Sequence, residues 1–239
     1  MEQSKNVLII VPAYNEEESI GRTLQSLLHT TKASKYNIDI CVVNDGSKDR
    51  TAEIVQSYPE VKLLNLPYNL GIGGAMQTGY RYAYESNYQI AIQFDADGQH
   101  NNEELNTIIE PLKNQEADMI VGSRFVLPTE YRGSSMRRIG IVYFMYLLYA
   151  LTKQKFTDPT SGFRAINHKI IKEFAHRYPK DYPEPEVLIY LHKKGYIIKE
   201  KSVKMQARQG GASSITPFKS LYYMIKVTLS IIMQKVIKE

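Results

Sequence analysis

Short runs of apolar residues recur along the first half of the chain, each bounded by polar or turn-forming residues. Continuous runs of this length predict strands that are buried on both faces of a sheet. The segments between them have the periodicity and polar starts of helices. Strands are expected at residues 7–11, 38–43, 61–66, 90–94 and 119–121, and helices from residue 16 and at 51–57, 74–84 and 103–112. This alternation predicts an α/β fold with a mostly parallel sheet and helices on both faces.

The second half of the chain has a different pattern. Residues 139–151 are uniformly apolar but fall short of the ~20 residues that a membrane-spanning helix needs. A polar turn at 157–164 and a weakly alternating strand at 197–205 follow. We expect residues 1–125 to form a ligand-binding half, residues 126–214 to form a second half that builds the far wall of the site, and residues 215–239 to form a separate helix.

The strand at 90–94 is followed directly by two carboxylates, Asp95 and Asp97. Gly98 and Gln99 come next. The carboxyl ends of strands form the ligand-binding edge of an open α/β sheet. Residues at i and i+2 on an extended segment face the same way. Oxygen ligands suit Mg²⁺ or Mn²⁺, which usually bind together with phosphates. The alternative is a solvated turn that contains Gly98.

Polar residues also follow the first two strands, at Pro12–Glu16 and Asn44–Ser47. Asn15 is a candidate N-cap of the first helix, with Glu18 at the capping-box position. Glycines cluster at 69–74, but a dinucleotide fingerprint would require glycine where Met76 stands. The cluster therefore predicts a tight turn and a close contact between helix and sheet.

The composition allows a large core, since 43% of the residues are hydrophobic, and Cys41 is the single cysteine. The net charge of +5 is compatible with phosphate-bearing partners, with an anionic membrane surface, or with an ordinary basic protein. The first apolar run is too short for a signal peptide, so the protein is expected to stay in the cytosol. Arg208 beside Gly210 and Gly211 predicts a loop that closes over phosphates, with a solvated surface loop as the alternative.

Several motifs occur together in one order along the chain: Val11–Glu16, Asn44–Ser47, Asn69 with Gly71 and Gly79, Asp95–His100, Gly122–Arg124, Asp158 with Ser161–Arg164, and Arg208 with Gly211 and Ser213. In these motifs the chain resembles family 2 glycosyltransferases, which have the GT-A fold and use nucleotide sugars. It is most similar to the branch that contains dolichol-phosphate mannose synthase and bacterial polyprenyl-phosphate glycosyltransferases.

The resemblance implies roles for individual residues. Nucleotide binding falls to Pro12, Ala13, Tyr14, Glu16, Asp45, Asp95, Ala96, Asp97 and Arg208, and Asp45 would accept a hydrogen bond from the base, with uracil favoured over guanine. Mg²⁺ or Mn²⁺ would be bound by Asp95, Asp97 and Gln99. The acceptor would meet Arg124, Arg137, Arg138, Ser161, Arg164 and Ser213. The catalytic residues would be Asp95, Asp97, Arg124, Arg138, Asp158 and Arg208.

The expected reaction is inverting transfer of one hexose-type sugar from a nucleoside diphosphate to polyprenyl phosphate. It would serve cell-surface glycan synthesis at the cytoplasmic face of the membrane. A lipid phosphate is already ionised, so positioning and electrostatics suffice. If the acceptor is instead a glycan or glycolipid hydroxyl, a carboxylate must take its proton, with Asp158, Glu184 or Glu186 as candidates.

Other classes of function are disfavoured. Processive polysaccharide synthases carry a Q-x-x-R-W motif, and this chain has no tryptophan. A non-catalytic membrane adaptor would not need both carboxylates, and the scattered basic residues do not form the stripe of a nucleic-acid-binding protein. Ser214 stands where some relatives have lysine, which puts one phosphate contact in doubt. A membrane-protein partner or a homo-oligomer is left open.

The last helix is expected at residues 218–238 and is amphipathic at helical spacing. One face carries Leu221, Ile225, Leu229, Ile232 and Val236, and the opposite face carries Lys219, Lys226, Ser230, Gln234 and Lys238. Such a helix is typical of the membrane interface. The alternative is a helix that packs on the protein's own sheet.

Overall fold

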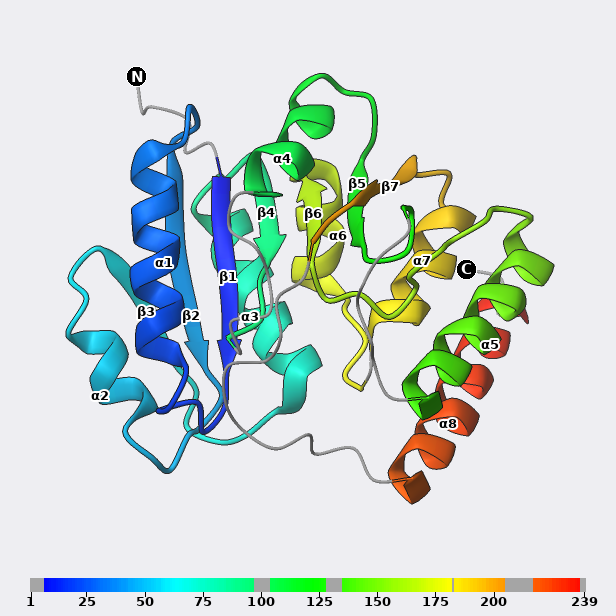
Figure 1. Cartoon of the computed structure of the whole chain (residues 1–239), viewed down its shortest axis with the longest axis horizontal. Coiled ribbons are helices and arrows are strands. Elements are labelled where there is room, and N and C mark those ends of the chain that lie inside the picture. Colours follow the sequence, from blue (N-terminus) through cyan, green and yellow to red (C-terminus); the bar gives the residue numbers. More distant parts are fainter. Residues whose placement is uncertain (1–6, 97–103, 128–134, 182, 205–216, 237–239) are drawn as a thin grey trace.

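The computed structural model describes residues 7–96, 104–127, 135–181, 183–204 and 217–236. These residues form a seven-stranded sheet in the order β3-β2-β1-β4-β6-β5-β7, and β6 is the strand that runs antiparallel to its neighbours (Figure 1). The strands are β1 Val7–Ala13, β2 Ile38–Asn44, β3 Val61–Asn65, β4 Ile90–Gln93, β5 Met119–Ser123, β6 Arg164–Asn167 and β7 Ile198–Ser202. The predicted α/β fold with a mostly parallel sheet is confirmed.

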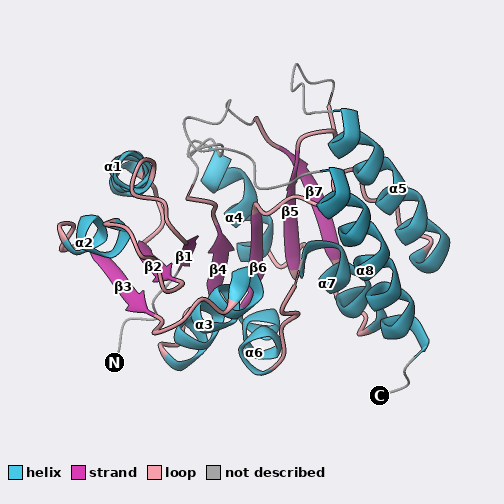
Figure 2. Cartoon of the chain, turned by 90° about the horizontal axis from the view of Figure 1, so that it is seen from below, coloured by secondary structure: helices cyan, strands magenta, loops and turns pink. Residues whose placement is uncertain are grey.

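Helices cover both faces of the sheet. They are α1 Ile20–Ala33, α2 Thr51–Gln56, α3 Gly71–Glu85, α4 Leu105–Lys113, α5 Ser135–Thr152, α6 His168–His176, α7 Pro183–Lys193 and α8 Pro217–Val236. Figure 2 shows α1 and α4 on one side of the sheet and α3 and α6 on the other, with α5 and α8 side by side beyond β7. Each face has its own apolar cluster, and β1, β4 and β5 between the clusters are almost wholly buried, as predicted. Strand β3 lies at the edge of the sheet and is only partly buried, so the prediction of burial on both faces is wrong for this strand.

Cys41 lies within β2 and is fully buried. Burial raises the pKa of its thiol to about 12, so the side chain is a neutral, small, apolar group at physiological pH.

Strand β6 was not predicted, and it joins the two halves of the chain. It pairs with both β4 and β5, and Arg164 is in register with Gln93 on one side and with Val121 on the other. Residues 1–125 and 126–214 therefore share one sheet. The division into a half that binds the nucleotide sugar, at 1–125, and a half that binds the acceptor, at 126–214, stays a prediction about function.

The first helix begins later than predicted. Its first residue is Ile20 and its N-cap is Ser19, so the capping role predicted for Asn15 and Glu18 is wrong. Asn15 has a positive φ of 55°, and its side chain accepts a hydrogen bond from the backbone N–H of Lys48 at 2.9 Å. The asparagine thus fixes one loop to another instead of starting a helix.

The glycine cluster opens α3, as the predicted tight turn requires. Gly71 has φ of 79°, a conformation that glycine adopts without strain. Further along α3, a Cβ on Gly79 would stand 2.3 Å from a side-chain carbon of Ile10 in β1. Helix α3 thus lies close against the sheet at Gly79, which is outside the glycine cluster. Within the cluster, a Cβ on Gly73 would stand 2.1 Å from Pro179 O, in the segment that follows α6, so the cluster's own close contact is not with the sheet.

Candidate active site

A cleft of about 380 Å³ opens where β1, β2 and β4 end. It is lined by Pro12, Ala13, Tyr14, Glu16, Asp45, Asn69, Gly71, Ile72, Ala75, Asp95 and Ala96. All of the described residues that were predicted to bind the nucleotide line this cleft. Asp97 and Arg208 complete that prediction but lie outside the described residues. Ile72 and Ala75 on α3 were missed, although the helix that follows a glycine turn at this edge is the signal that places them there.

Two loops that form one wall of the cleft are joined by reciprocal hydrogen bonds. The backbone N–H of Asn15 donates to Ser47 Oγ at 3.0 Å, and that of Lys48 donates back to Asn15 Oδ1. The next amide, of Glu16, donates to Thr51 Oγ1 at 2.8 Å. These bonds fix the loop that carries Tyr14 and Glu16 to the loop that carries Asp45.

Asp45 is buried and holds the start of α3. Its Oδ1 accepts the N–H of Leu70 at 2.7 Å and its Oδ2 accepts the N–H of Gly71 at 2.9 Å. A carboxylate at a helix N-terminus is favourable because the helix dipole is positive there. Each carboxylate oxygen has a second lone pair, so the group keeps capacity to accept from a base. The base-reading role stays a prediction.

Asp95 follows β4 and is partly buried at the floor of the cleft. The next residue is tied to α1, since Ala96 O accepts a hydrogen bond from Thr23 Oγ1 at 2.9 Å. A carboxylate oxygen at this edge fits a hard divalent cation. Within the described ranges there is no group of three or more metal-ligating side chains, and Asp97 and Gln99 lie outside them.

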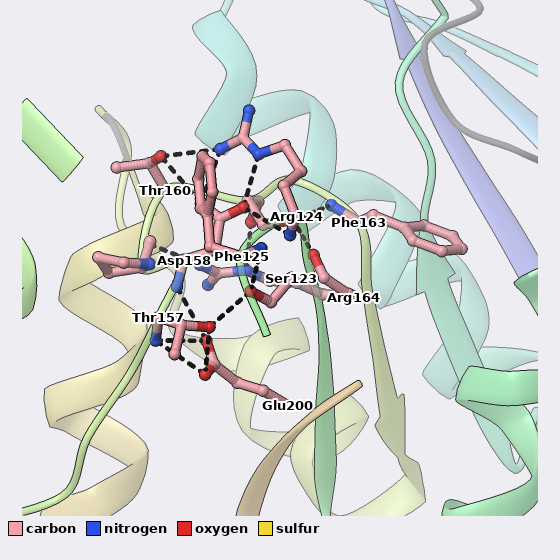
Figure 3. Close-up of polar contacts among 12 residues, drawn as sticks. Ser123, Arg124, Phe125, Thr157, Asp158, Thr160, Phe163, Arg164 and Glu200 are labelled. Atoms are coloured by element: carbon pink, nitrogen blue, oxygen red, sulfur yellow. Dashed lines mark hydrogen bonds and ion pairs between the residues drawn. The ribbon is translucent and has the colours of Figure 1, made fainter. Parts of the chain in front are cut away.

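Arg124 and Asp158 form a buried ion pair (Figure 3). Arg124 Nε lies 2.6 Å from Asp158 Oδ2 and its Nη2 lies 2.7 Å from Oδ1, a bidentate geometry. The two residues are 2% and 0% exposed. Both carboxylate oxygens therefore accept from one guanidinium. The roles predicted for Arg124 at the acceptor and for Asp158 as a base are not tested by this geometry and stay predictions.

Glu200 on β7 was not predicted and anchors the segment beside that ion pair. Its carboxylate accepts the N–H groups of Thr157 and Asp158 at 2.8 and 3.0 Å and the hydroxyl of Thr157 at 2.8 Å. The same hydroxyl lies 2.6 Å from Ser123 Oγ at the end of β5 (Figure 3). Burial raises the pKa of Glu200. No sequence signal distinguishes this residue within its charged strand.

Ser161 and Arg164 are buried and bonded to the backbone. Ser161 Oγ donates to Gly122 O at 2.6 Å. Arg164 donates to the carbonyls of Ser161, Pro159 and Glu184. The acceptor-binding role predicted for these two side chains stays a prediction.

Three further residues were predicted to contact the acceptor, and their roles stay predictions. Arg138 is exposed and lies in the first turns of α5. Helix α5 begins on the side of the molecule toward which β1 points (Figure 1). The structure does not describe the side chain of Arg137, and Ser213 lies outside the described residues.

A family model described as "Glycosyl transferase family 2" matches residues 8–175, which include the whole cleft. The chain belongs to this family. It is 32% identical over 186 residues to UDP-N-acetylglucosamine--dolichyl-phosphate N-acetylglucosaminyltransferase of Methanococcus voltae, covering 70% of this chain and 72% of the relative. It is 36% identical over 124 residues to undecaprenyl-phosphate mannosyltransferase of Micrococcus luteus, covering 50% and 49%.

One solved structure with a similar fold is glucosyl-3-phosphoglycerate synthase from Mycobacterium tuberculosis. That enzyme, solved with Mn²⁺, UDP and phosphoglyceric acid, superposes with a TM-score of 0.74 at 17% identity, covering 98% of this chain and 80% of the synthase. The likeness shows a shared GT-A-type fold. The resemblance recognised from the motifs, and the enzyme class that it implied, are confirmed.

Proposed function

We propose that this glycosyltransferase moves one hexose-type sugar from a nucleoside diphosphate, with UDP favoured, to polyprenyl phosphate, with inversion at the sugar. The observation that carries the proposal is the cleft at the ends of β1, β2 and β4, which places Asp45 and Asp95 in one site. The names of the relatives support the acceptor, since both act on a polyprenyl-type phosphate lipid.

The two sides of the cleft suit the two parts of the donor. The loops of Tyr14 and Asp45 would bind the nucleoside, while Asp95, with Asp97 and Gln99, would hold Mg²⁺ or Mn²⁺ at the diphosphate. The metal ion would neutralise charge that grows on the leaving diphosphate. Arg208 would approach the same phosphates. The synthase solved with Mn²⁺ and UDP supports a divalent ion in a fold of this kind.

The chemical step needs no proton transfer when the acceptor is a phosphate. An ionised oxygen of polyprenyl phosphate forms a bond to the anomeric carbon while the bond from that carbon to the diphosphate oxygen breaks. The work of the protein is then to align the two groups and to exclude water. Attack from the side opposite the leaving group inverts the anomeric configuration.

A membrane surface would deliver the acceptor, and α5 and α8 present an apolar face for it. On the described part of α8 the exposed large apolar side chains are Ile225, Leu229, Ile232 and Met233, and on that of α5 they are Ile139, Val142, Tyr143, Tyr146 and Tyr149. The two helices lie side by side and are joined by a hydrogen bond between Tyr143 and Thr228 (Figure 2). Tyrosines are enriched at membrane interfaces because they combine an apolar ring with a polar tip.

The orientation of α8 favours this interpretation over simple packing on the sheet. Ser230 and Gln234, on the polar face of the helix, hydrogen-bond to Glu186 on α7, and Lys226 binds Asp181 at 2.7 Å. Val227 and Ile231 provide a narrow buried seam. The polar face is thus turned to the protein and most of the predicted apolar face is turned outward. In the described ranges no helix is long and apolar enough to cross a bilayer.

We therefore expect the double variant Leu229→Ser/Met233→Ser to bind anionic liposomes at least about tenfold more weakly than the wild type. Each side chain contributes about 1.5–3 kcal/mol when fully buried in an apolar phase, and about 1.4 kcal/mol corresponds to tenfold in affinity. Both residues are more than half exposed, so the fold should tolerate the changes. Liposome sedimentation measures the binding.

Leu229→Met is the matched control, because it keeps an apolar side chain at the same position. Equal sedimentation of the serine double variant and the wild type would exclude this face as the membrane contact. If the wild type is a dimer and the double variant is a monomer, the face would be assigned to a second copy of the chain instead.

The proposed reaction is tested by incubating the protein with labelled UDP- and GDP-sugars, polyprenyl phosphate and Mg²⁺ or Mn²⁺. Label in the organic phase that is lost on mild acid treatment is the expected result. Label found only on a glycan or glycolipid hydroxyl would establish the alternative acceptor and direct attention to Glu184 and Glu186. No transfer from any donor would contradict the proposal.

A further inference from the structure

Arg164 is a buried cation whose direct partners are backbone carbonyls. It is 1% exposed, and its Nε, Nη1 and Nη2 donate to Ser161 O, Glu184 O and Pro159 O at 2.7, 2.7 and 2.9 Å. Among the described residues no carboxylate lies within ion-pair distance of it. Burying a charge without a directly bonded counter-ion is costly. The presence of a buried arginine here therefore calls for a physical explanation.

The three carbonyls belong to two segments that are distant in the sequence. Pro159 and Ser161 lie in the turn between Asp158 and β6, and Glu184 lies in the first turn of α7. The planar guanidinium holds several acceptors in a fixed geometry, which the single ammonium group of lysine cannot reproduce. Arg164 thus fixes the turn and the start of α7 relative to each other.

The residue next to one of these carbonyls, Gly162, lies against Asp95. A Cβ on Gly162 would stand 2.8 Å from Asp95 Oδ2, closer than Cβ atoms approach in proteins, and 3.1 Å from Oδ1, which is a tight contact. The backbone of Gly162 therefore forms the wall behind the Asp95 carboxylate. A methyl group there would have to displace that carboxylate, which lines the cleft.

The charges of this region act on one another. Burial raises the pKa of Glu184, the Arg164 guanidinium lowers it, and the charge of Asp95 raises it. The buried cation and the two carboxylates therefore share one neighbourhood at the base of the cleft. Gln93 belongs to the same neighbourhood, since it pairs with Arg164 across the sheet and its buried Oε1 has no partner among the described residues.

We propose that Arg164 is a positioning residue, which holds the turn of Gly162 so that this turn seats the Asp95 carboxylate for the diphosphate. The proposal rests on the proposed function, which assigns Asp95 to the metal and diphosphate. It gives Arg164 a role different from the acceptor contact that its motif predicted.

The test uses two variants of the full-length chain, Gly162→Ala and Arg164→Lys. Both are expected to lower kcat at least about tenfold and to weaken Mn²⁺ binding in the presence of UDP several-fold, with an unchanged KM for polyprenyl phosphate. Electron paramagnetic resonance of free Mn²⁺ measures the binding without turnover. Thermal unfolding reports on the fold of each variant.

Matched controls are Gly140→Ala, where a Cβ meets nothing within 4 Å, and Arg81→Lys at an exposed position. Both should behave as the wild type. Gly162→Ala tests the placement of the Asp95 carboxylate even if Arg164→Lys fails to fold. We expect the alanine variant to fold, because its methyl group meets the end of the Asp95 side chain and not the backbone.

Three results would overturn the proposal. One is normal kcat and normal Mn²⁺ affinity in Gly162→Ala. Another is a lower melting temperature of Arg164→Lys with normal Mn²⁺ affinity, which makes Arg164 purely structural. The third is a raised KM for polyprenyl phosphate alone, which returns Arg164 to the acceptor. Failure of the wild type itself to bind Mn²⁺ with UDP would instead refute the metal role in the proposed function.

Discussion

Replacement of Asp95 by asparagine is expected to lower kcat by at least about 100-fold, the scale seen when one electrostatic stabiliser of a transition state is removed. The carboxylate stands at the floor of the cleft beside Ala96. Asparagine has nearly the same shape but no charge, so the metal ion would lose a negatively charged ligand, and the leaving diphosphate would lose the neutralisation that the metal ion provides. Initial rates at saturating donor and acceptor measure the change.

Glu85→Gln is the control, because it removes an exposed carboxylate that forms a surface ion pair with its helical neighbour Arg81. Chelation of divalent metal should reproduce the loss in the wild type, and added Mg²⁺ or Mn²⁺ should restore the rate. Full turnover by Asp95→Asn, or by the wild type in excess chelator, would refute the metal site.

The second large effect is expected on stability. Asp158→Asn should lower the free energy of unfolding by about 3–5 kcal/mol, because it leaves the buried Arg124 guanidinium without its counter-ion. The pair is bidentate and both residues are almost completely inaccessible to solvent. Urea unfolding followed by circular dichroism measures the loss. Asp181→Asn, which breaks an exposed pair with Lys226, should cost less than about 1 kcal/mol.

The same variant separates this structural role from the alternative in which Asp158 is a general base. A base would lose turnover on conversion to asparagine while the protein kept its stability. Unchanged stability with a collapse of kcat would therefore reverse the interpretation of the ion pair, and would favour a hydroxyl acceptor.

Much of the donor side of this molecule could be predicted from the sequence. Strand β1 is buried along almost its whole length and β2 is buried from Ile40 onward, so both contain uninterrupted apolar runs, at residues 7–13 and 40–43. Parallel strands bring their carboxyl ends to one edge, so polar residues that follow separate strands meet there. Asp45 and Asp95 come together for this reason, and no long-range information is needed to expect it.

The acceptor side could not be predicted in the same way. The four-residue strand β6 has too few apolar residues to show a pattern, and its place between β4 and β5 depends on pairing across the chain. The resemblance offered several arginines for the acceptor, among them Arg124, Arg138 and Arg164. Burial and partners distinguish them, since Arg124 meets Asp158, Arg164 meets carbonyls, and Arg138 is exposed.

The position of β6 also bears on how the protein forms during synthesis. A nascent chain that has reached residue 125 can assemble β3-β2-β1-β4, but β5 then has no partner, because both of its neighbours come later. The edge of β4 stays open until residues 164–167 leave the ribosome, and β5 gains its second neighbour only with residues 198–202. Unpaired strand edges of this kind can form hydrogen bonds with strands of other chains, which leads to aggregation. The sheet of this enzyme is thus completed late in synthesis. For the same reason, a chain divided near residue 125 would give two fragments that each lack part of the sheet.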